Sequence, residues 1–422
     1  MILQRLAVVV LGLASALAQA RDLGLAEAER LLAEHNRELL AARRAVESAG
    51  AQRITAAARP NPTLSLNSTS ISNKYNSGPG TSNEWRADTV LRIDQPFERG
   101  GKRELRMDAA EGLENAARGD SLDVLRAQLA QLRGAYYDLK QAEAKVAILD
   151  ENAQLFGRTL AAAQARLKAG DLAAADVARV QVDYERAQND ARGSVADLAR
   201  ARLALAYKIG EDRAAAEQHA TDPWPARERP GAAEVERAIE RTVETRPDVA
   251  AARARLAAAE KLRDLAKSQQ TRDVTVGAQY ERYPGTVPAD SIGFGISVPL
   301  FLGNDFSGDI QRAEVDRYAA LDALERARTL AANDIRRAAA DLASAADRLE
   351  RYDSTLLAAA QRSAQAAEFA FQRGAISVLE VLDARRTLRA VQLEALAARA
   401  DHAKALAAWR ASQTTMEMLG PR

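Results

Sequence analysis

The chain has 422 residues, with 59 lysines and arginines against 58 aspartates and glutamates, so its formal net charge is +1. It has no cysteine and only three histidines, which excludes a disulfide scaffold, a cysteine-ligated metal site and a thiol nucleophile. The charge balance argues against a nucleic-acid-binding protein, and 28% charged with only 5% aromatic residues is typical of long helices rather than of a thick globular core.

Residues 1–20 have the three parts of a cleaved secretion signal. Arg5 gives a positive start, Leu6–Leu17 is an apolar run, and Ala18-Gln19-Ala20 is a small-x-small cleavage site. A membrane anchor is the alternative, but a run of about a dozen apolar residues is too short to cross a bilayer core of roughly 30 Å as a helix. We therefore expect an exported protein that begins at Arg21. Because Arg21 is not a cysteine, no lipid attachment is expected there.

The remainder of the chain repeats one unit twice. KAGDLAAADVARVQ (Lys168–Gln181) aligns with RGAISVLEVLDARR (Arg373–Arg386), and both halves have the same predicted order of helix, hairpin, long helix, glycine turn and helix. The joint between the halves contains three prolines and cannot be a continuous helix. The predicted divisions are a first repeat over 21–210, a linker over 211–231, a second repeat over 232–412 and a C-terminal tail over 413–422.

Each repeat contains one β-hairpin, over about 62–96 and about 273–299, in which apolar and polar residues alternate. Each strand has roughly 8–11 residues, the length that crosses a bilayer as a tilted strand. A soluble hairpin with one wet face is the alternative, but the secretion signal and the long helices favour membrane strands. Pro96 and Pro299 are expected to end strands and to turn the chain towards the helices.

Long helices follow the hairpins. Lys102–Leu167 contains no proline, and roughly 66 helical residues would span on the order of 100 Å. Asp305–Arg373 repeats the pattern, and both segments carry apolar stripes at coiled-coil spacing. A simple coiled-coil rod is the alternative, against which the paired hairpins argue. We predict a mainly α protein with a small β part, in which long helices form an α-helical barrel.

Four strands in lipid would leave two open edges, at several kcal/mol for each backbone group without a partner. The chain must then pair with copies of itself. Two copies would close a narrow eight-stranded barrel, whereas three would give twelve strands and room for a lumen. Small polar residues on the predicted inward face (Thr275, Gly277, Gly293, Gly295 and Ser297) favour an open channel. We therefore predict a homotrimer with a 12-stranded transmembrane β-barrel, four strands coming from each chain.

The twofold repeat, the strand ends Gln95-Pro96-Phe97 and Val298-Pro299-Leu300, and the two glycine turns that precede acidic-Val pairs together resemble the TolC family of outer-membrane efflux proteins. The similarity covers essentially the whole mature chain. Gln95–Arg103, QPFERGGKR, is most similar to the CzcC-like branch that works with heavy-metal exporters of the resistance-nodulation-division type.

The resemblance implies a passive exit duct in the outer membrane of a Gram-negative bacterium, with a periplasmic helical extension. Its implied partners are outer-membrane lipid, a periplasmic adaptor (membrane fusion) protein and an inner-membrane resistance-nodulation-division pump. No enzyme activity, cofactor or high-affinity metal site is expected, because the sequence shows no H-E-x-x-H motif, no P-loop and no nucleophile-base pair. Heavy-metal cations are the expected cargo. Organic compounds or type I secreted polypeptides are the alternative cargo, and a periplasmic coiled-coil scaffold without a pore is the alternative protein.

The resemblance also assigns roles to the helix tips, where the family has a glycine followed six residues later by an acid. It implies adaptor contacts at Gly170, Asp171, Leu172, Asp176, Gly374, Ala375 and Ile376. Glu380 and Asp383 match an acidic ring at the pore entrance, with solvated helix charges as the alternative. The family prototype has a latch arginine where this chain has Ile376. Closure is therefore expected to depend on packing by Phe371, Ile376 and Leu379.

Lys102 and Arg103 follow two glycines at the start of a predicted helix. Cations at that end oppose the helix dipole, so another partner is expected. The strand direction places both residues at the periplasmic rim of the membrane, where lipid phosphates lie within reach of snorkelling side chains.

Overall fold

The computed structural model describes residues 21–72, 86–211, 218–283 and 289–419. The predicted signal, 1–20, lies outside these ranges, as do parts of the predicted linker and tail. The chain forms two compact units. One comprises residues up to Leu40 with Val124–Glu240 and Asn333–Thr414, and the other comprises Ala41–Asp123, Arg241–Ala332 and the residues from Thr415. Each unit therefore takes segments from both sequence repeats.

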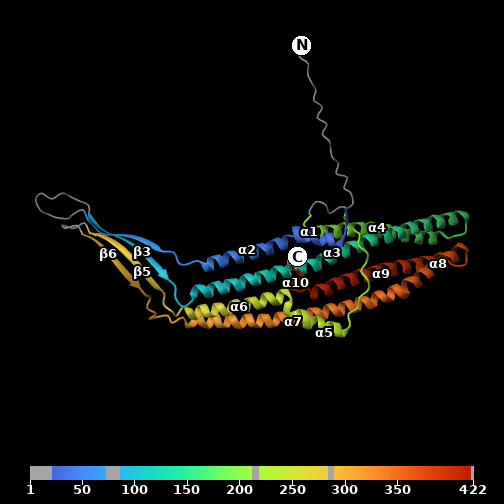
Figure 1. Ribbon diagram of the computed structural model, residues 1–422. Coiled ribbons are helices and arrows are strands. Elements are labelled where there is room, and N and C mark those ends of the chain that lie inside the picture. The colour runs from blue at the N-terminus through green and yellow to red at the C-terminus, as the bar shows by residue number, and fades with distance from the viewer. Residues whose placement is uncertain (1–20, 73–85, 212–217, 284–288, 420–422) are drawn as a thin grey trace, which may run out of the picture. The chain divides into compact units, whose positions relative to one another are not determined.

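The helices and strands follow the predicted order (Figure 1). The first half contains β1 (Arg21–Leu23), α1 (Leu25–His35), α2 (Arg37–Ala57), β2 (Thr63–Ser72), β3 (Arg86–Phe97), α3 (Lys102–Ala169), α4 (Ala174–Ile209) and β4 (Gln218–Ala220). The second half contains α5 (Ala232–Thr242), a 3₁₀ turn (Val243–Thr245), α6 (Pro247–Ser268), β5 (Val274–Tyr283), β6 (Ala289–Ser297), α7 (Ser307–Arg351), a π-helical turn (Tyr352–Leu356), α8 (Leu357–Gln372), α9 (Val378–Ser412) and α10 (Met416–Leu419). The prediction of a mainly helical chain with four long strands is confirmed. The π-helical turn between α7 and α8 was not predicted.

The two hairpins join into one four-stranded antiparallel sheet in the order β2-β3-β5-β6. Its centre pairs β3 from the first repeat with β5 from the second, with Leu91 opposite Tyr280 and Pro96 opposite Thr275. Within the described part of the chain, β2 and β6 each pair on one side only. The sheet therefore has two open edges.

In the unit that contains this sheet, small residues allow helices to pack closely. Gly112 and Gly119 of α3 face Ala258 and Ala251 of α6, and a Cβ added to either glycine would lie 2.9 Å from the facing alanine Cβ. Any side chain at these two glycines would force the helices apart, because carbon atoms in contact sit near 3.5–4.0 Å. The Ala- and Gly-rich composition thus gives close helix contacts in place of bulky core residues.

The other unit has a conventional apolar core around Tyr136 of α3, which is fully buried with Leu23, Leu132 and Leu205. The Tyr136 hydroxyl donates to the carbonyl of Leu23 over 3.0 Å and accepts from the backbone N–H of Asp222 at the same distance. Burial is the main reason why the pKa of this phenol is raised. These contacts anchor a small sheet that the sequence did not predict, in which β1 pairs in parallel with β4.

Candidate functional site

The four-stranded sheet has one apolar and one polar face. Residues directly opposite each other on paired strands share a face, so the register assigns Leu66, Leu91, Tyr280 and Ile292 to one side. Large apolar side chains on this face are exposed: Leu64, Leu66, Leu91, Ile93, Phe97, Val276, Tyr280, Ile292, Phe294 and Ile296. A contiguous exposed apolar surface of this kind is typical of a membrane or protein contact.

The opposite face is polar and carries an ion pair. Nε of Arg92 donates to Oδ2 of Asp94 over 2.7 Å, and Nη1 of Arg92 donates to Oε1 of Gln279 over 3.1 Å. Gly277 lies opposite both Asp94 and Gly295 on neighbouring strands. The small inward-facing residues predicted from the sequence therefore leave room for a charged pair, which sequence reasoning did not identify.

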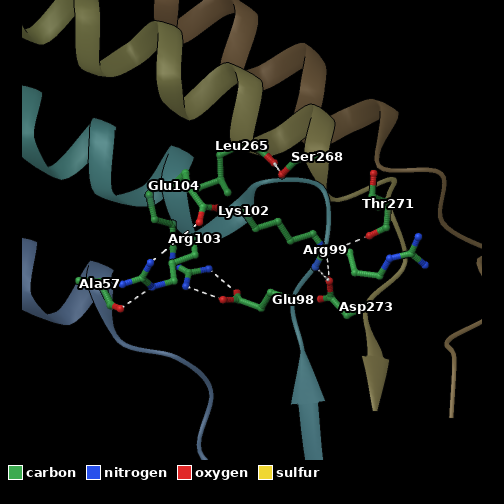
Figure 2. A network of polar contacts seen from close by, with 11 residues as sticks. Ala57, Glu98, Arg99, Lys102, Arg103, Glu104, Leu265, Ser268, Thr271 and Asp273 are labelled. Carbon is green, nitrogen blue, oxygen red and sulfur yellow. Dashed lines mark hydrogen bonds and ion pairs between the residues drawn. The ribbon is translucent and has the colours of Figure 1, made fainter. Parts of the chain in front are cut away.

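At the end of the sheet, β3 leads into α3 through a turn containing Gly100 and Gly101, both at positive φ (Figure 2). Pro96, predicted to make this turn, still lies within β3, and the strand ends at Phe97. Pro299 follows β6 by two residues and precedes the loop that leads to α7. The prolines thus lie at the ends of the strands, while the glycines supply the left-handed conformations of the first turn.

The prediction that Lys102 reaches towards lipid is wrong, because its side chain is buried within the protein. Its side chain is only 4% exposed, and its ammonium donates to Oδ1 of Asp273 over 2.8 Å and to the carbonyl of Thr271 over 2.9 Å (Figure 2). The partner that offsets the unfavourable helix dipole is therefore a carboxylate of the protein. Arg103 is partly exposed, and its Nε donates to the carbonyl of Ala57 over 2.7 Å.

The two helix tips have the same turn. Gly170 (φ 85°) and Gly374 (φ 75°) are left-handed, and each donates to the carbonyl three residues earlier. The next residues, Asp171 and Ala375, donate to the carbonyls of Arg166 and Ala370 over 2.9 Å. This pair of bonds defines a Schellman motif, which ends a helix where glycine supplies the left-handed residue. The glycine turns predicted from the sequence repeat thus have a shared local cause.

The helices that follow the tips begin differently. Oγ of Ser377 caps α9 by accepting from the backbone N–H of Glu380 over 3.4 Å, whereas Ala173 before α4 has no side chain that can cap. Ser377 and Glu380 have the spacing of a capping box. Asp176 of α4 lies at the equivalent position and is 3.6 Å from Arg179. The acidic residue after each tip thus lies in the first turn of a helix, where its negative charge interacts favourably with the positive end of the helix dipole.

Four of the five predicted entrance residues of the second tip line one groove. Ile376, Leu379, Glu380 and Asp383 share an open hollow of about 540 Å³ with residues of α8. Glu380 and Asp383 are exposed. Phe371, by contrast, packs into an apolar cluster beneath both tips with Leu172, and the Arg166 guanidinium lies 4.5 Å from its ring centre. The structure therefore separates Phe371 from the other four predicted entrance residues.

Two arginines of α9 tie this part of the unit together and were missed by sequence reasoning. Arg385 is 8% exposed and bonds to Glu368 of α8 and to Thr159 and the Leu155 carbonyl of α3. Arg386 holds both oxygens of the buried Asp183 of α4 over 2.7 and 2.6 Å. Their position within a repeat offers no local signal for burial, because arginine on an amphipathic helix ordinarily faces water.

No helix within the described ranges combines the length and apolar character needed to cross a membrane. Among the same residues, no group of three or more histidine, aspartate or glutamate side chains is arranged to hold a metal ion.

A two-faced sheet joined to long helices with paired glycine tips is the fold of an outer-membrane efflux channel. OprN, an outer-membrane channel, matches with a TM-score of 0.75 and 21% identity over 92% of this chain and 89% of its own. CusC matches with a TM-score of 0.75 and 19% identity over 93% of this chain and 92% of its own.

The model of the outer membrane efflux protein family matches residues 15–211 and 238–412, so the chain belongs to that family. It is an outer-membrane channel for efflux by tripartite systems, with a periplasmic helical domain, and not an enzyme. A curated relative, the cobalt-zinc-cadmium resistance protein CzcC of Cupriavidus metallidurans, is 28% identical over 309 residues, which are 71% of each chain.

Proposed function

We propose that this chain is the exit duct of a tripartite heavy-metal efflux system. Three copies close a 12-stranded barrel in the outer membrane, and metal cations pass through it without being bound. The observation that carries the proposal is the four-stranded sheet, with its exposed apolar face, its polar face and its two open edges. Such a sheet is stable in lipid only when its edges pair with other copies.

The metal cargo is supported by the 28% identity to a cobalt-zinc-cadmium resistance protein. The pump supplies the energy and the adaptor docks at the tips, at Gly170–Leu172 with Asp176 and at Gly374–Ile376. In a threefold-symmetric trimer, the three copies of Glu380 and Asp383 form an acidic ring at the entrance. Such a ring attracts cations. Residues 1–20 direct export and are removed.

The groove at the end of the sheet marks the membrane boundary in this proposal. It has a volume of about 630 Å³, and its lining includes Phe97, the guanidinium groups of Arg59 and Arg103, and the carboxylates of Glu98 and Glu104, of which Glu98 is paired with Arg106. An exposed aromatic ring beside two guanidinium groups suits the level where acyl chains meet lipid phosphates.

Three measurements test the proposal. Native mass spectrometry in detergent should give a trimer, and a monomer or dimer would exclude the barrel. Purified protein should conduct ions across planar bilayers, whereas a periplasmic scaffold would not. A strain that lacks the gene should lose tolerance to zinc, cobalt, cadmium, nickel or copper. Unchanged tolerance to all five would remove the metal assignment and leave organic compounds or secreted polypeptides as cargo.

A further inference from the structure

On the polar face, Arg92 is the one basic residue between Asp88 and Asp94 of β3 and among the residues of β2, β5 and β6 that pair with this stretch or with its partners. Asp88, Asp94 and Glu281 are the acids on the same face. Arg92 contacts Asp94 directly, whereas Glu281 accepts from the uncharged Tyr283 hydroxyl over 2.6 Å and the Ser291 hydroxyl over 3.3 Å. Among these contacts, Asp94 therefore has a cation as its partner, whereas Glu281 has uncharged partners.

The backbone around this pair is shaped to hold it against the wall. A Cβ added to Gly277 would lie 2.3 Å from Oδ1 of Asp94 and 2.9 Å from Nη2 of Arg92, and one added to Gly295 would lie 3.7 Å from the same Nη2. The guanidinium thus lies across β5 towards β6, in space that exists because both residues lack side chains. Gln279 fixes its other side through the 3.1 Å bond from Nη1.

Both oxygens of Asp94 are withdrawn from the polar face. Oδ2 accepts from Arg92, and Oδ1 is buried against Gly277 without a hydrogen-bond partner among the described residues. An ionised carboxylate left free on a wet surface is a good oxygen ligand for a divalent cation. Arg92 occupies the position from which a cation would approach Asp94.

We propose that Arg92 is a selectivity-determining residue of the pore, which neutralises Asp94 so that the wall of the barrel does not retain divalent cations in transit. The inference rests on the proposed function, because the polar face must line the lumen. With one Arg92–Asp94 pair from each copy, a ring of ion pairs lies at one level of the wall, and loss of the arginines would turn it into a ring of carboxylates.

The test compares purified assembled channels in planar bilayers. The two readouts are the cation-to-anion permeability ratio in a KCl gradient and the loss of conductance on addition of Cd²⁺. Arg92→Gln should raise the permeability ratio several-fold and make the conductance sensitive to Cd²⁺. Asp94→Asn should shift the ratio towards anions, and the double variant should lose the Cd²⁺ sensitivity.

Arg282→Gln is the matched control, because it removes the same charge from the apolar face of β5, where Arg282 lies two residues from Tyr280. It should behave as the wild type. The inference is overturned if Arg92→Gln channels conduct with unchanged ratio and no response to Cd²⁺, or if Arg282→Gln gives the same change. If Arg92→Gln does not assemble, the sign of the Asp94→Asn shift decides, since an unchanged or more cation-selective channel contradicts the proposal. Wild-type protein that gives no conductance would instead refute the proposed function itself.

Discussion

Nζ of Lys102 and Oδ1 of Asp273 lie 2.8 Å apart where the sheet gives way to helices, and the lysine is 4% exposed while the aspartate is 36% exposed. Loss of the aspartate would leave the buried ammonium without the carboxylate that it contacts directly. We expect Asp273→Asn to lower the free energy of unfolding by about 3 kcal/mol. Chemical denaturation in detergent measures the change.

An exposed pair in the same unit provides the comparison. Lys261 and Asp108 are 3.0 Å apart, with exposures of 45% and 48%. Water screens this pair, so Asp108→Asn should cost less than about 1 kcal/mol. If both variants lost the same free energy of unfolding, burial of Lys102 would not be the reason for the cost of Asp273→Asn.

The tip glycines should be sensitive to substitution for a purely conformational reason. Gly374 has φ 75°, and a Cβ there would meet nothing within 4 Å. Gly374→Ala should therefore destabilise the protein by about 1–2 kcal/mol through left-handed strain alone. Gly193, inside α4 and equally open, should respond with the opposite sign, because Gly193→Ala should stabilise the helix by roughly 0.5–1 kcal/mol. Thermal unfolding followed by circular dichroism measures the stability of both variants. A loss of stability in Gly193→Ala as well as in Gly374→Ala would contradict the argument.

Neutralising the proposed entrance ring should reduce the preference for cations. Glu380→Gln with Asp383→Asn removes both exposed carboxylates of the groove near Ile376 while keeping the shape of the side chains. Reversal potentials in a KCl gradient should move towards the non-selective value. The difference from wild type should shrink in about 1 M salt, where the screening length is about 3 Å. Identical reversal potentials at low salt would identify the two acids as solvated helix charges.

Acid should weaken the contact between α3 and α4. The hydrogen bond from Lys145 is the largest cause that lowers the pKa of Asp197 below its ordinary 3.8, and burial opposes the shift. The stabilising contribution of a carboxylate with a lowered pKa is complete above the ordinary pKa and is lost as the pH falls through the lowered one. Asp197→Asn should cost at most about 1 kcal/mol at neutral pH. The gap between the two unfolding midpoints should close below pH 3.8, and a gap that widens there would reverse the assignment.

The parts of the fold that depend on local rules could be predicted from the sequence. Alternation gave the hairpins, proline-free Ala-rich segments gave the long helices, and Gly170 and Gly374 gave the tips, because each rule acts within a few residues. Of the candidate site, Glu380, Asp383, Ile376 and Leu379 were predicted together, and they line one groove.

The contacts that could not be predicted join residues far apart in the chain. Arg385 meets Thr159 from 226 positions away, and Lys102 meets Asp273 from 171 positions away. A sequence pattern reports which residue types sit on a helix, but burial of a charge depends on which distant segment packs over it. The assignment of Lys102 to a lipid surface was wrong for this reason.

Both compact units draw on both repeats, and the first also needs Asn333–Thr414, close to the C-terminus. Although the halves look like duplicates, neither encodes an autonomous folding unit. The first unit cannot fold until its last segment, Asn333–Thr414, has been synthesised. Until then, the apolar surfaces of its earlier segments stay exposed. We therefore expect this protein to need holding factors during its biogenesis, and we expect truncations that remove part of Asn333–Thr414 to be degraded rather than to yield a stable shorter product.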